Sequence, residues 1–251
     1  MVQMTDESLM SIFIRMYFNE ILVSVGTAFL VNSKSGSPLL ITNRHNVTGK
    51  HNETGALLSP KTGLVPNRIE IYHNRLGERG AHIIKSEELL LDEFDPKWIE
   101  HPTWGPKVDF VAIPLTDLED VAIYAYTLDM GRDIFLGVTG TVSVVGFPFG
   151  IQVGNNAAVW ATGTVASEPE IDYRGLPLFL IDCRSRGGQS GSPVIAYRSG
   201  GSVVNMIGGG GAVWPGPVKK FVGIYSGRVN PESDLGMVWK ASAINELVDS
   251  I

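Results

Sequence analysis

The chain has 251 residues, of which 44% are apolar and only 18% are charged, and it contains 29 glycines. Its formal net charge of −6, from 20 basic and 26 acidic residues, argues against a nucleic-acid-binding surface, because such surfaces carry a basic excess. Few charges and many glycines favour strands joined by tight turns, since glycine tolerates the positive φ angles that turns require.

The chain has one cysteine, Cys183, so no intrachain disulfide can form. Asp6 and Glu7 lie near the N-terminus, and no uninterrupted apolar stretch of a signal peptide precedes Arg15. No run approaches the roughly 18 apolar residues of a membrane span. We therefore expect a soluble, cytoplasmic protein with no membrane partner. The five histidines lack the spacing of metal ligands, so we expect neither a metal nor a cofactor.

The first half of the chain alternates apolar runs with turn signals. Residues 12–17 and 21–31 are typical of two strands around a turn at 18–20. Residues 39–42 predict a buried strand that ends directly before His45, and residues 46–68 are polar and predict a surface loop. Further strands are expected over residues 68–73, within 80–99 and over 108–115.

Residues 116–134 carry acidic side chains and are interpreted as the link between two halves. In residues 241–251, Ile244, Leu247, Val248 and Ile251 fall on one face of a helix. About a dozen short strands with one terminal helix favour a sandwich or barrel over a βαβ fold, and the strand pattern alone does not choose between these two. The strands expected in the second half are 141–145, 157–165, 178–182, 193–197, 203–207, 221–226 and 237–240.

The strongest local motif is Gly188–Gln189–Ser190–Gly191–Ser192–Pro193. A nucleophilic serine needs an exposed tight turn, backbone N–H donors for an oxyanion and a nearby base. Glycines at 188 and 191 permit such a turn and let backbone approach a substrate carbonyl. The alternative is an ordinary Gly/Ser turn, which is common in proteins.

Two other residues fit roles beside such a serine. His45 follows a buried strand and opens a polar loop, a place where a base is held rigidly and still meets solvent. Asp109 precedes the apolar run Phe110–Ile113, and a carboxylate at the mouth of such a strand must be exposed or paired, for example with a histidine N–H. Taken alone, such residues are more often a loop histidine without a catalytic role and a strand-end aspartate that caps a turn.

Together these motifs resemble the trypsin-like (chymotrypsin-fold) serine peptidases, particularly their bacterial cytoplasmic and HtrA-like members. Asn43 and Arg44 depart from the small residues that commonly precede the histidine, and Ser192 stands where glycine is more usual. The order His, Asp, Ser agrees with this family and differs from subtilisins and α/β-hydrolases. The segments that carry the resemblance are 26–31, 40–47, 101–102 with 108–115, 144–148, 188–193 and 221–227.

The resemblance implies an all-β fold of two six-stranded antiparallel barrels, at 10–118 and 135–240, with a helix at 241–251, in a single peptidase domain. It implies that Ser190 is the nucleophile, His45 the general base and Asp109 the residue that orients the histidine. The N–H groups of Gly188 and Ser190 would form the oxyanion hole. The partner is then a peptide or protein substrate.

The resemblance also indicates where substrate binds. Tyr225, Ser226 and Gly227 lie on a segment similar to the strand that lines the primary specificity pocket, and Ser226 and Gly227 would pair with substrate backbone. Arg184, six residues before Ser190, is interpreted as a basic pocket floor that favours an acidic or small residue before the cut, with solvent exposure as the alternative. Gln189 replaces the aspartate that binds a freed N-terminus in digestive enzymes, so the enzyme would be active as synthesised or be switched by loops or a regulatory partner protein.

Three functions remain open at this point. The first is an active serine endopeptidase, which hydrolyses peptide bonds through an acyl-enzyme on Ser190. The second is a catalytically latent protease fold that binds peptides or partner proteins. The third is an esterase that uses the same triad. Sequence alone does not identify the natural substrate, the oligomeric state or the role of residues 46–107.

Overall fold

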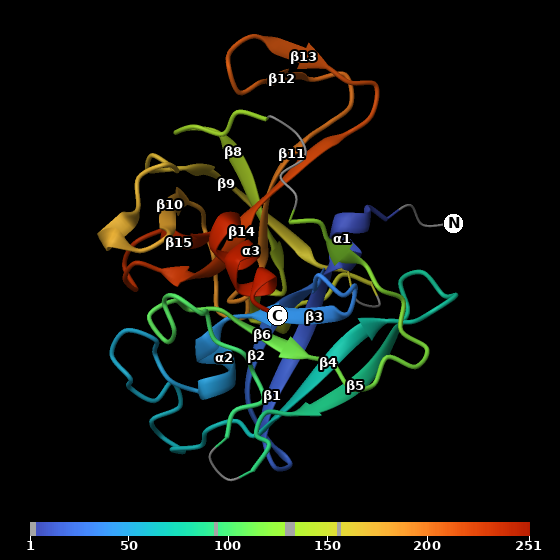
Figure 1. Cartoon of the computed structure of the whole chain (residues 1–251), viewed down its shortest axis with the longest axis vertical. Helices are drawn as coiled ribbons and strands as arrows, with labels where there is room; N and C mark the ends of the chain where they lie inside the picture. The colour runs from blue at the N-terminus through green and yellow to red at the C-terminus, as the bar shows by residue number, and fades with distance from the viewer. Residues whose placement is uncertain (1–3, 93–94, 129–133, 155–156) are drawn as a thin grey trace.

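The computed structural model describes residues 4–92, 95–128, 134–154 and 157–251. Within these residues the chain builds two β-sheet halves, with the N-terminal half below and the C-terminal half above in Figure 1. The longest helix, α3 (Ala241–Asp249), ends the chain. The predicted all-β class with a C-terminal helix is confirmed.

The first half is a sheet in which one parallel strand joins an antiparallel set. Its strands are β1 (Ser11–Phe18), β2 (Ile21–Asn32), β3 (Pro38–Thr42), β4 (Arg68–Asn74), β5 (His82–Glu88), β6 (Val111–Pro114) and β7 (Ala125–Tyr126). In the described residues their order is β5-β4-β1-β2-β3-β6, and β7 pairs with β2 in parallel. Asn19, with φ of 52°, makes the turn between β1 and β2.

The central strands are apolar on both faces because each face meets a different core. In β1, Ile12 joins a cluster made only of first-half residues, whereas Phe13 joins a cluster to which both halves contribute. In β6, Val111 belongs to the first cluster and Ala112 to the second. Side chains alternate between the two sides of a strand, so two-sided burial produces the continuous apolar runs seen in the sequence.

The first half differs from the closed six-stranded barrel that the resemblance implied. Among the described residues, β5 and β6 do not pair with each other. β6 has only four residues and ends at Pro114, which lacks an N–H for a longer ladder. Residues 97–99, which lie between β5 and β6 in the chain, form hydrogen bonds in both directions instead. The Lys97 N–H donates to the Leu89 carbonyl, just after β5, at 2.9 Å, and Ile99 exchanges two backbone hydrogen bonds with Ala112 in β6. This segment therefore covers the edge of β6.

The second half is a closed six-stranded barrel in the described residues, which confirms the second predicted barrel. Its order is β10-β15-β14-β11-β8-β9, and each paired neighbour is antiparallel. The barrel strands are β8 (Thr141–Gly146), β9 (Val159–Val165), β10 (Leu178–Asp182), β11 (Pro193–Arg198), β14 (Val218–Arg228) and β15 (Leu235–Lys240).

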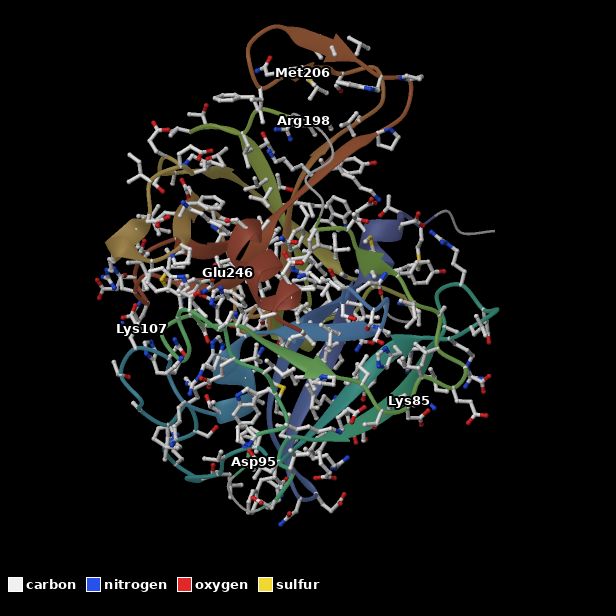
Figure 2. All side chains as sticks on the ribbon, in the orientation of Figure 1. Lys85, Asp95, Lys107, Arg198, Met206 and Glu246 are labelled. Atoms are coloured by element: carbon white, nitrogen blue, oxygen red, sulfur yellow. The ribbon has the colours of Figure 1, made fainter. Side chains whose placement is uncertain are left out.

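A two-stranded hairpin projects from this barrel, at the top of Figure 1. It consists of β12 (Val203–Asn205) and β13 (Gly211–Val213), and Figure 2 labels Met206 within it. Ile134, Val204 and Val218 form a small buried cluster at its base. Strand β13 is absent from the sequence prediction, because the glycine run before it indicates only a turn.

Two short helices are also absent from the sequence prediction: α1 (Asp6–Met10) and α2 (Arg44–Thr48). Contacts with the second half stabilise α1, where the Lys219 ammonium lies 2.5 Å from the Glu7 carboxylate and the Trp160 indole donates to Ser8 at 2.9 Å. Such contacts between distant segments cannot be predicted from the local sequence pattern. Within the described residues, no helix has the length and apolar character that crossing a membrane requires.

Three residues of the predicted helix face, Ile244, Leu247 and Val248, are buried in the core shared by the two halves. The prediction is wrong for Ile251, which lies beyond the helix end at Asp249 and is 42% exposed. Of the predicted link at 116–134, residues 129–133 lie outside the described residues. The remainder of the link contains β7, which returns the chain to β2 of the first half.

The side chain of His73 in β4 is buried and makes no hydrogen bond among the described residues. It is 1% exposed, and neither ring nitrogen has a partner among the described residues. Loss of hydration lowers the pKa of His73 to about 4, an effect that Glu87 opposes and Lys85 reinforces. The unfolded chain therefore binds a proton at residue 73 between pH 6.5 and about 4, where the folded chain does not.

We predict that the free energy of unfolding falls by up to about 3 kcal/mol through this residue as pH drops from 6.5 to 4. His73→Leu should remove that part of the pH dependence, because leucine carries no titratable group. Denaturant unfolding at pH 7, 5 and 4 measures the effect. The exposed His51→Gln variant serves as the control and should follow the wild type, and a His73→Leu profile parallel to wild type would contradict the prediction.

Candidate active site

His45 and Asp109 meet where β3 and β6 lie side by side. The two strands are antiparallel, with Thr42 opposite Val111, so the residues just beyond one strand end lie beside those that precede the other strand. His45 Nδ1 lies 2.6 Å from Asp109 Oδ2, and the His45 backbone N–H donates to Oδ1 at 2.9 Å. The structure thus brings together two of the three predicted catalytic residues.

The surroundings fix the orientation of this pair. The side chains of His45 and Asp109 are only 14% and 8% exposed. The Asn43 amide donates to the backbone carbonyl of Asp109 at 2.5 Å, which ties the aspartate segment to the start of α2. Since a carboxylate only accepts, the proton of a neutral His45 ring lies on Nδ1, and Nε2 is left as an acceptor.

Ser190 lies in a turn of the second half that bonds directly to the first half. Its carbonyl accepts from the Thr27 backbone N–H at 2.9 Å and from the Asn46 amide at 3.3 Å. Asn46 follows His45 in α2, so the predicted base and nucleophile come from adjacent segments. No hydrogen bond joins the Ser190 hydroxyl to the His45 ring in the described part of the chain; catalytic hydrogen bonds are often long before substrate binds.

Two backbone donors in the Ser190 turn are unused. Gly188, with φ of 91°, begins the turn in a conformation that favours glycine. The other N–H groups of the turn bond within the chain: Gln189 to Arg186 at 3.2 Å, Gly191 to Tyr225 at 2.9 Å and Ser192 to Gln189 at 3.0 Å. Among the described residues, the N–H groups of Gly188 and Ser190 donate no hydrogen bond. Together they can stabilise an oxyanion.

A cavity of about 340 Å³ adjoins His45 and Asp109. Its lining includes the apolar side chains of Leu176, Met237 and Trp239. This volume suits a bulky side chain or part of a peptide.

Charged side chains surround the mouth of this cavity. The Arg174 guanidinium lies 3.2 Å from the Glu53 carboxylate, which connects loops from the two halves beside the cavity. Lys107 and Arg228 also line it, and Figure 2 shows Lys107 at the level where the two halves meet. The lining therefore combines apolar surface with three basic side chains, Lys107, Arg174 and Arg228, and two acidic ones, Glu53 and Asp109.

The predicted substrate-binding residues occupy different environments. Ser226 and Gly227 line the cavity, and the Ser226 hydroxyl accepts from the Trp239 indole at 3.1 Å. Tyr225 is 2% exposed, and its hydroxyl bonds to that of Ser185. Burial raises the pKa of Tyr225 to about 12, so the phenol stays protonated at neutral pH.

Arg184 does not form a pocket floor. Its side chain is 80% exposed, and its guanidinium lies 3.9 Å from the Asp234 carboxylate. The position of Arg184 in the sequence gives only its spacing from Ser190. The direction of its side chain depends on the surface loop that contains Asp234. Solvent exposure, the alternative considered from the sequence, describes Arg184.

Cys183 is buried, and loss of hydration raises the pKa of its thiol to about 11. The thiolate form needed for nucleophilic attack is therefore rare at neutral pH. Among the residues described, no group of three or more His, Cys, Asp or Glu side chains gathers closely enough to hold a metal ion.

Three polar residues of the site lacked a role in the sequence analysis: Thr27, Asn43 and Asn46. All are buried, at 0%, 0% and 4% exposure, and all bond to the segments of Asp109 or Ser190. The available signal was the presence of polar residues inside or directly after apolar strands, because buried polar groups require hydrogen-bond partners.

Comparison with protein families gives a match to the trypsin-like peptidase domain over residues 26–206. This span begins in β2, contains His45, Asp109 and Ser190, and covers well over half of the chain. A search of curated proteins found no match.

Solved structures show a similar fold. A serine endoprotease from Yersinia pestis superposes with a TM-score of 0.54 at 10% identity, over 100% of this chain and 67% of that one. The thermostable serine protease AL20 from an extremophilic microorganism gives a TM-score of 0.55 at 13% identity, over 98% of both chains. At these identities the likeness is one of fold.

Proposed function

The chain belongs to the trypsin-like peptidase domain family, and on this basis we propose that it is a serine endopeptidase acting through Ser190, His45 and Asp109. The observation that carries the proposal is the His45–Asp109 pair at 2.6 Å, held beside the Ser190 turn by Asn46. The pair orients a ring whose free nitrogen can accept the proton of a serine hydroxyl.

In the proposed reaction, Ser190 Oγ attacks the carbonyl carbon of the scissile bond while its proton passes to His45 Nε2. Asp109 stabilises the resulting imidazolium and keeps Nδ1 protonated. The tetrahedral intermediate then expels the amine, which takes the proton from His45, and leaves an acyl group on Ser190. Water then loses a proton to His45 and attacks the ester carbonyl. The second tetrahedral intermediate breaks its bond to Ser190 Oγ, which takes the proton from His45 as the acid leaves.

The N–H groups of Gly188 and Ser190 would receive the negative oxygen of each tetrahedral intermediate. Both are free of hydrogen bonds within the described residues and belong to one turn. One donor of this kind contributes about 2.7–4 kcal/mol of transition-state stabilisation. The proposed endopeptidase therefore needs no metal ion to polarise the carbonyl.

The cavity beside His45 would bind the substrate on the acyl side of the cut. Ser226 and Gly227 at its edge would pair with substrate backbone by strand addition. Leu176, Met237 and Trp239 would then contact an apolar side chain. The positive charges of Lys107 and Arg228 at this site favour substrates with acidic residues nearby.

The residue at the cut itself would be small. Tyr225 exchanges backbone bonds with Gly191 and Ser192, so it lies directly beside the Ser190 turn. Its ring is buried and tied to Ser185, and a Cβ added to Gly236 would lie 2.6 Å from that ring. We infer that this ring occupies the space next to the Ser190 turn that a long substrate side chain would need.

A latent, peptide-binding protease fold is the second candidate. It is favoured by one observation, the absence of a Ser190–His45 hydrogen bond among the described residues. A substrate or partner protein would then be needed to bring the hydroxyl and the ring together. An esterase on the same triad would share the chemistry of the acyl-enzyme.

We predict that a fluorophosphonate probe labels Ser190 of the wild-type chain, and that Ser190→Ala abolishes labelling. Asp109→Asn should slow labelling by about 10³–10⁴-fold, because the histidine loses its correct tautomer. Mass spectrometry of the labelled peptide locates the modified residue. A wild type that never reacts, with or without peptide, would support the latent fold instead, whereas labelling that survives Ser190→Ala would show that another residue is the nucleophile. Comparing peptide and ester turnover separates a peptidase from an esterase.

In a peptide library, we predict preferential cleavage after small residues such as alanine and serine. Tyr225→Val should extend the preference to larger apolar residues, since it opens space behind Ser190. Arg184→Ala is the matched control and should leave the profile unchanged, because Arg184 is exposed. A clear preference for Lys or Arg, or an acidic preference that Arg184→Ala removes, would overturn this assignment of specificity.

A further inference from the structure

Thr27 in β2 connects the first half to both segments of the second half that shape the proposed oxyanion hole. The side chain is fully buried, with 0% exposure. Its hydroxyl donates to the Gly188 carbonyl at 2.8 Å and accepts from the Phe147 backbone N–H at 3.2 Å. Its backbone N–H donates to the Ser190 carbonyl at 2.9 Å. Thr27 thus hydrogen-bonds to the residues on both sides of Gln189, Gly188 and Ser190.

A second contact fixes the peptide that precedes Gly188. The Phe149 backbone N–H donates to the Gly187 carbonyl at 2.6 Å. In a trans peptide the carbonyl and the N–H point in opposite directions, so this bond turns the Gly188 N–H away from Phe149. The Thr27 hydroxyl holds the next carbonyl in the same way. The two bonds therefore set the orientation in which the Gly188 N–H stays unpaired within the described residues.

Thr27 itself has little freedom to move. Its carbonyl accepts from the Thr42 hydroxyl at 2.8 Å. A Cβ added to Gly191 would lie 1.9 Å from that carbonyl, so the strand and the turn approach as closely as backbone allows. Thr42 ends β3, the strand that leads to His45, and Gly191 belongs to the Ser190 turn. The contacts that fix Thr27 therefore involve the segment of the proposed base and the segment of the proposed nucleophile.

We propose that Thr27 is a positioning residue, whose hydroxyl holds Gly188 so that its N–H and that of Ser190 converge on the oxyanion. This inference rests on the proposed function, because it assigns Thr27 a part in the same reaction. The hydroxyl touches neither substrate nor reacting atoms. Its effect is therefore on the transition state, in which the oxyanion forms, and far less on binding of the uncharged substrate.

The test compares Thr27→Val, which removes the hydroxyl and keeps the shape, with Thr27→Ser, which keeps the hydroxyl. Misplacing one oxyanion donor by a fraction of an ångström to 1 Å predicts a loss of about 10–100-fold in kcat with KM within about twofold. Thr27→Ser should recover most of kcat. A peptide boronate or aldehyde, which forms a tetrahedral adduct, should bind Thr27→Val more weakly by a similar factor.

Ser11→Ala is the matched control. Ser11 is 1% exposed, and its hydroxyl donates across the same interface to the Val145 carbonyl at 2.7 Å, without a hydrogen bond to residues 187–191. The Ser11→Ala variant should lose about as much thermal stability as Thr27→Val does, and should keep kcat within about twofold of wild type. Thermal unfolding confirms that each variant is folded, and Thr27→Ala replaces Thr27→Val if the latter is not.

Each outcome decides the inference. The role of Thr27 is supported if Thr27→Val loses kcat, Thr27→Ser recovers it, and Ser11→Ala keeps it. An active wild type with unchanged kcat in folded Thr27→Val, an equal kcat loss in Ser11→Ala, or a loss confined to KM overturns the role of Thr27 and leaves the proposed function intact. A wild type that neither cleaves peptides nor reacts with the probe overturns both.

Discussion

The hydrogen bonds between β2 and the Ser190 turn are the contacts on which the proposed chemistry depends. His45 and Asp109 belong to the first half and Ser190 to the second, so no element within one half can align all three. Thr27 and Asn46 both donate to the Ser190 carbonyl and fix the two halves in register. Both donors are buried, and hydrogen bonds are stronger where water is excluded.

Much of the fold could be predicted because strand alternation and turn residues are local signals. The predicted strands at 12–17, 21–31 and 39–42 correspond closely to β1, β2 and β3. The short helix α2 and the gap between β5 and β6 could not be predicted in the same way. Their form depends on contacts with distant segments, such as the bond of Ile99 to Ala112. A resemblance that implies a closed barrel carries no information about this gap.

The candidate site was likewise predicted only where local sequence motifs indicate it. His45 and Asp109 were predicted from motif context, and the antiparallel pairing of β3 with β6 explains why residues 64 positions apart meet. The roles of Thr27 and Asn43 were not predicted, because these side chains act through hydrogen bonds to backbone, which leave no sequence motif. Arg184 was assigned from its spacing to Ser190, yet spacing does not determine whether a side chain points inward or to solvent.

The central claim is that Ser190 and the Gly188 N–H act on one carbonyl group beside His45. A crystal structure of the chain after reaction with a peptidyl phosphonate tests this most directly. The account predicts a bond from Ser190 Oγ to phosphorus and a phosphonyl oxygen about 3 Å from the nitrogens of Gly188 and Ser190. An adduct on another residue, or a phosphonyl oxygen directed away from both nitrogens, would contradict it.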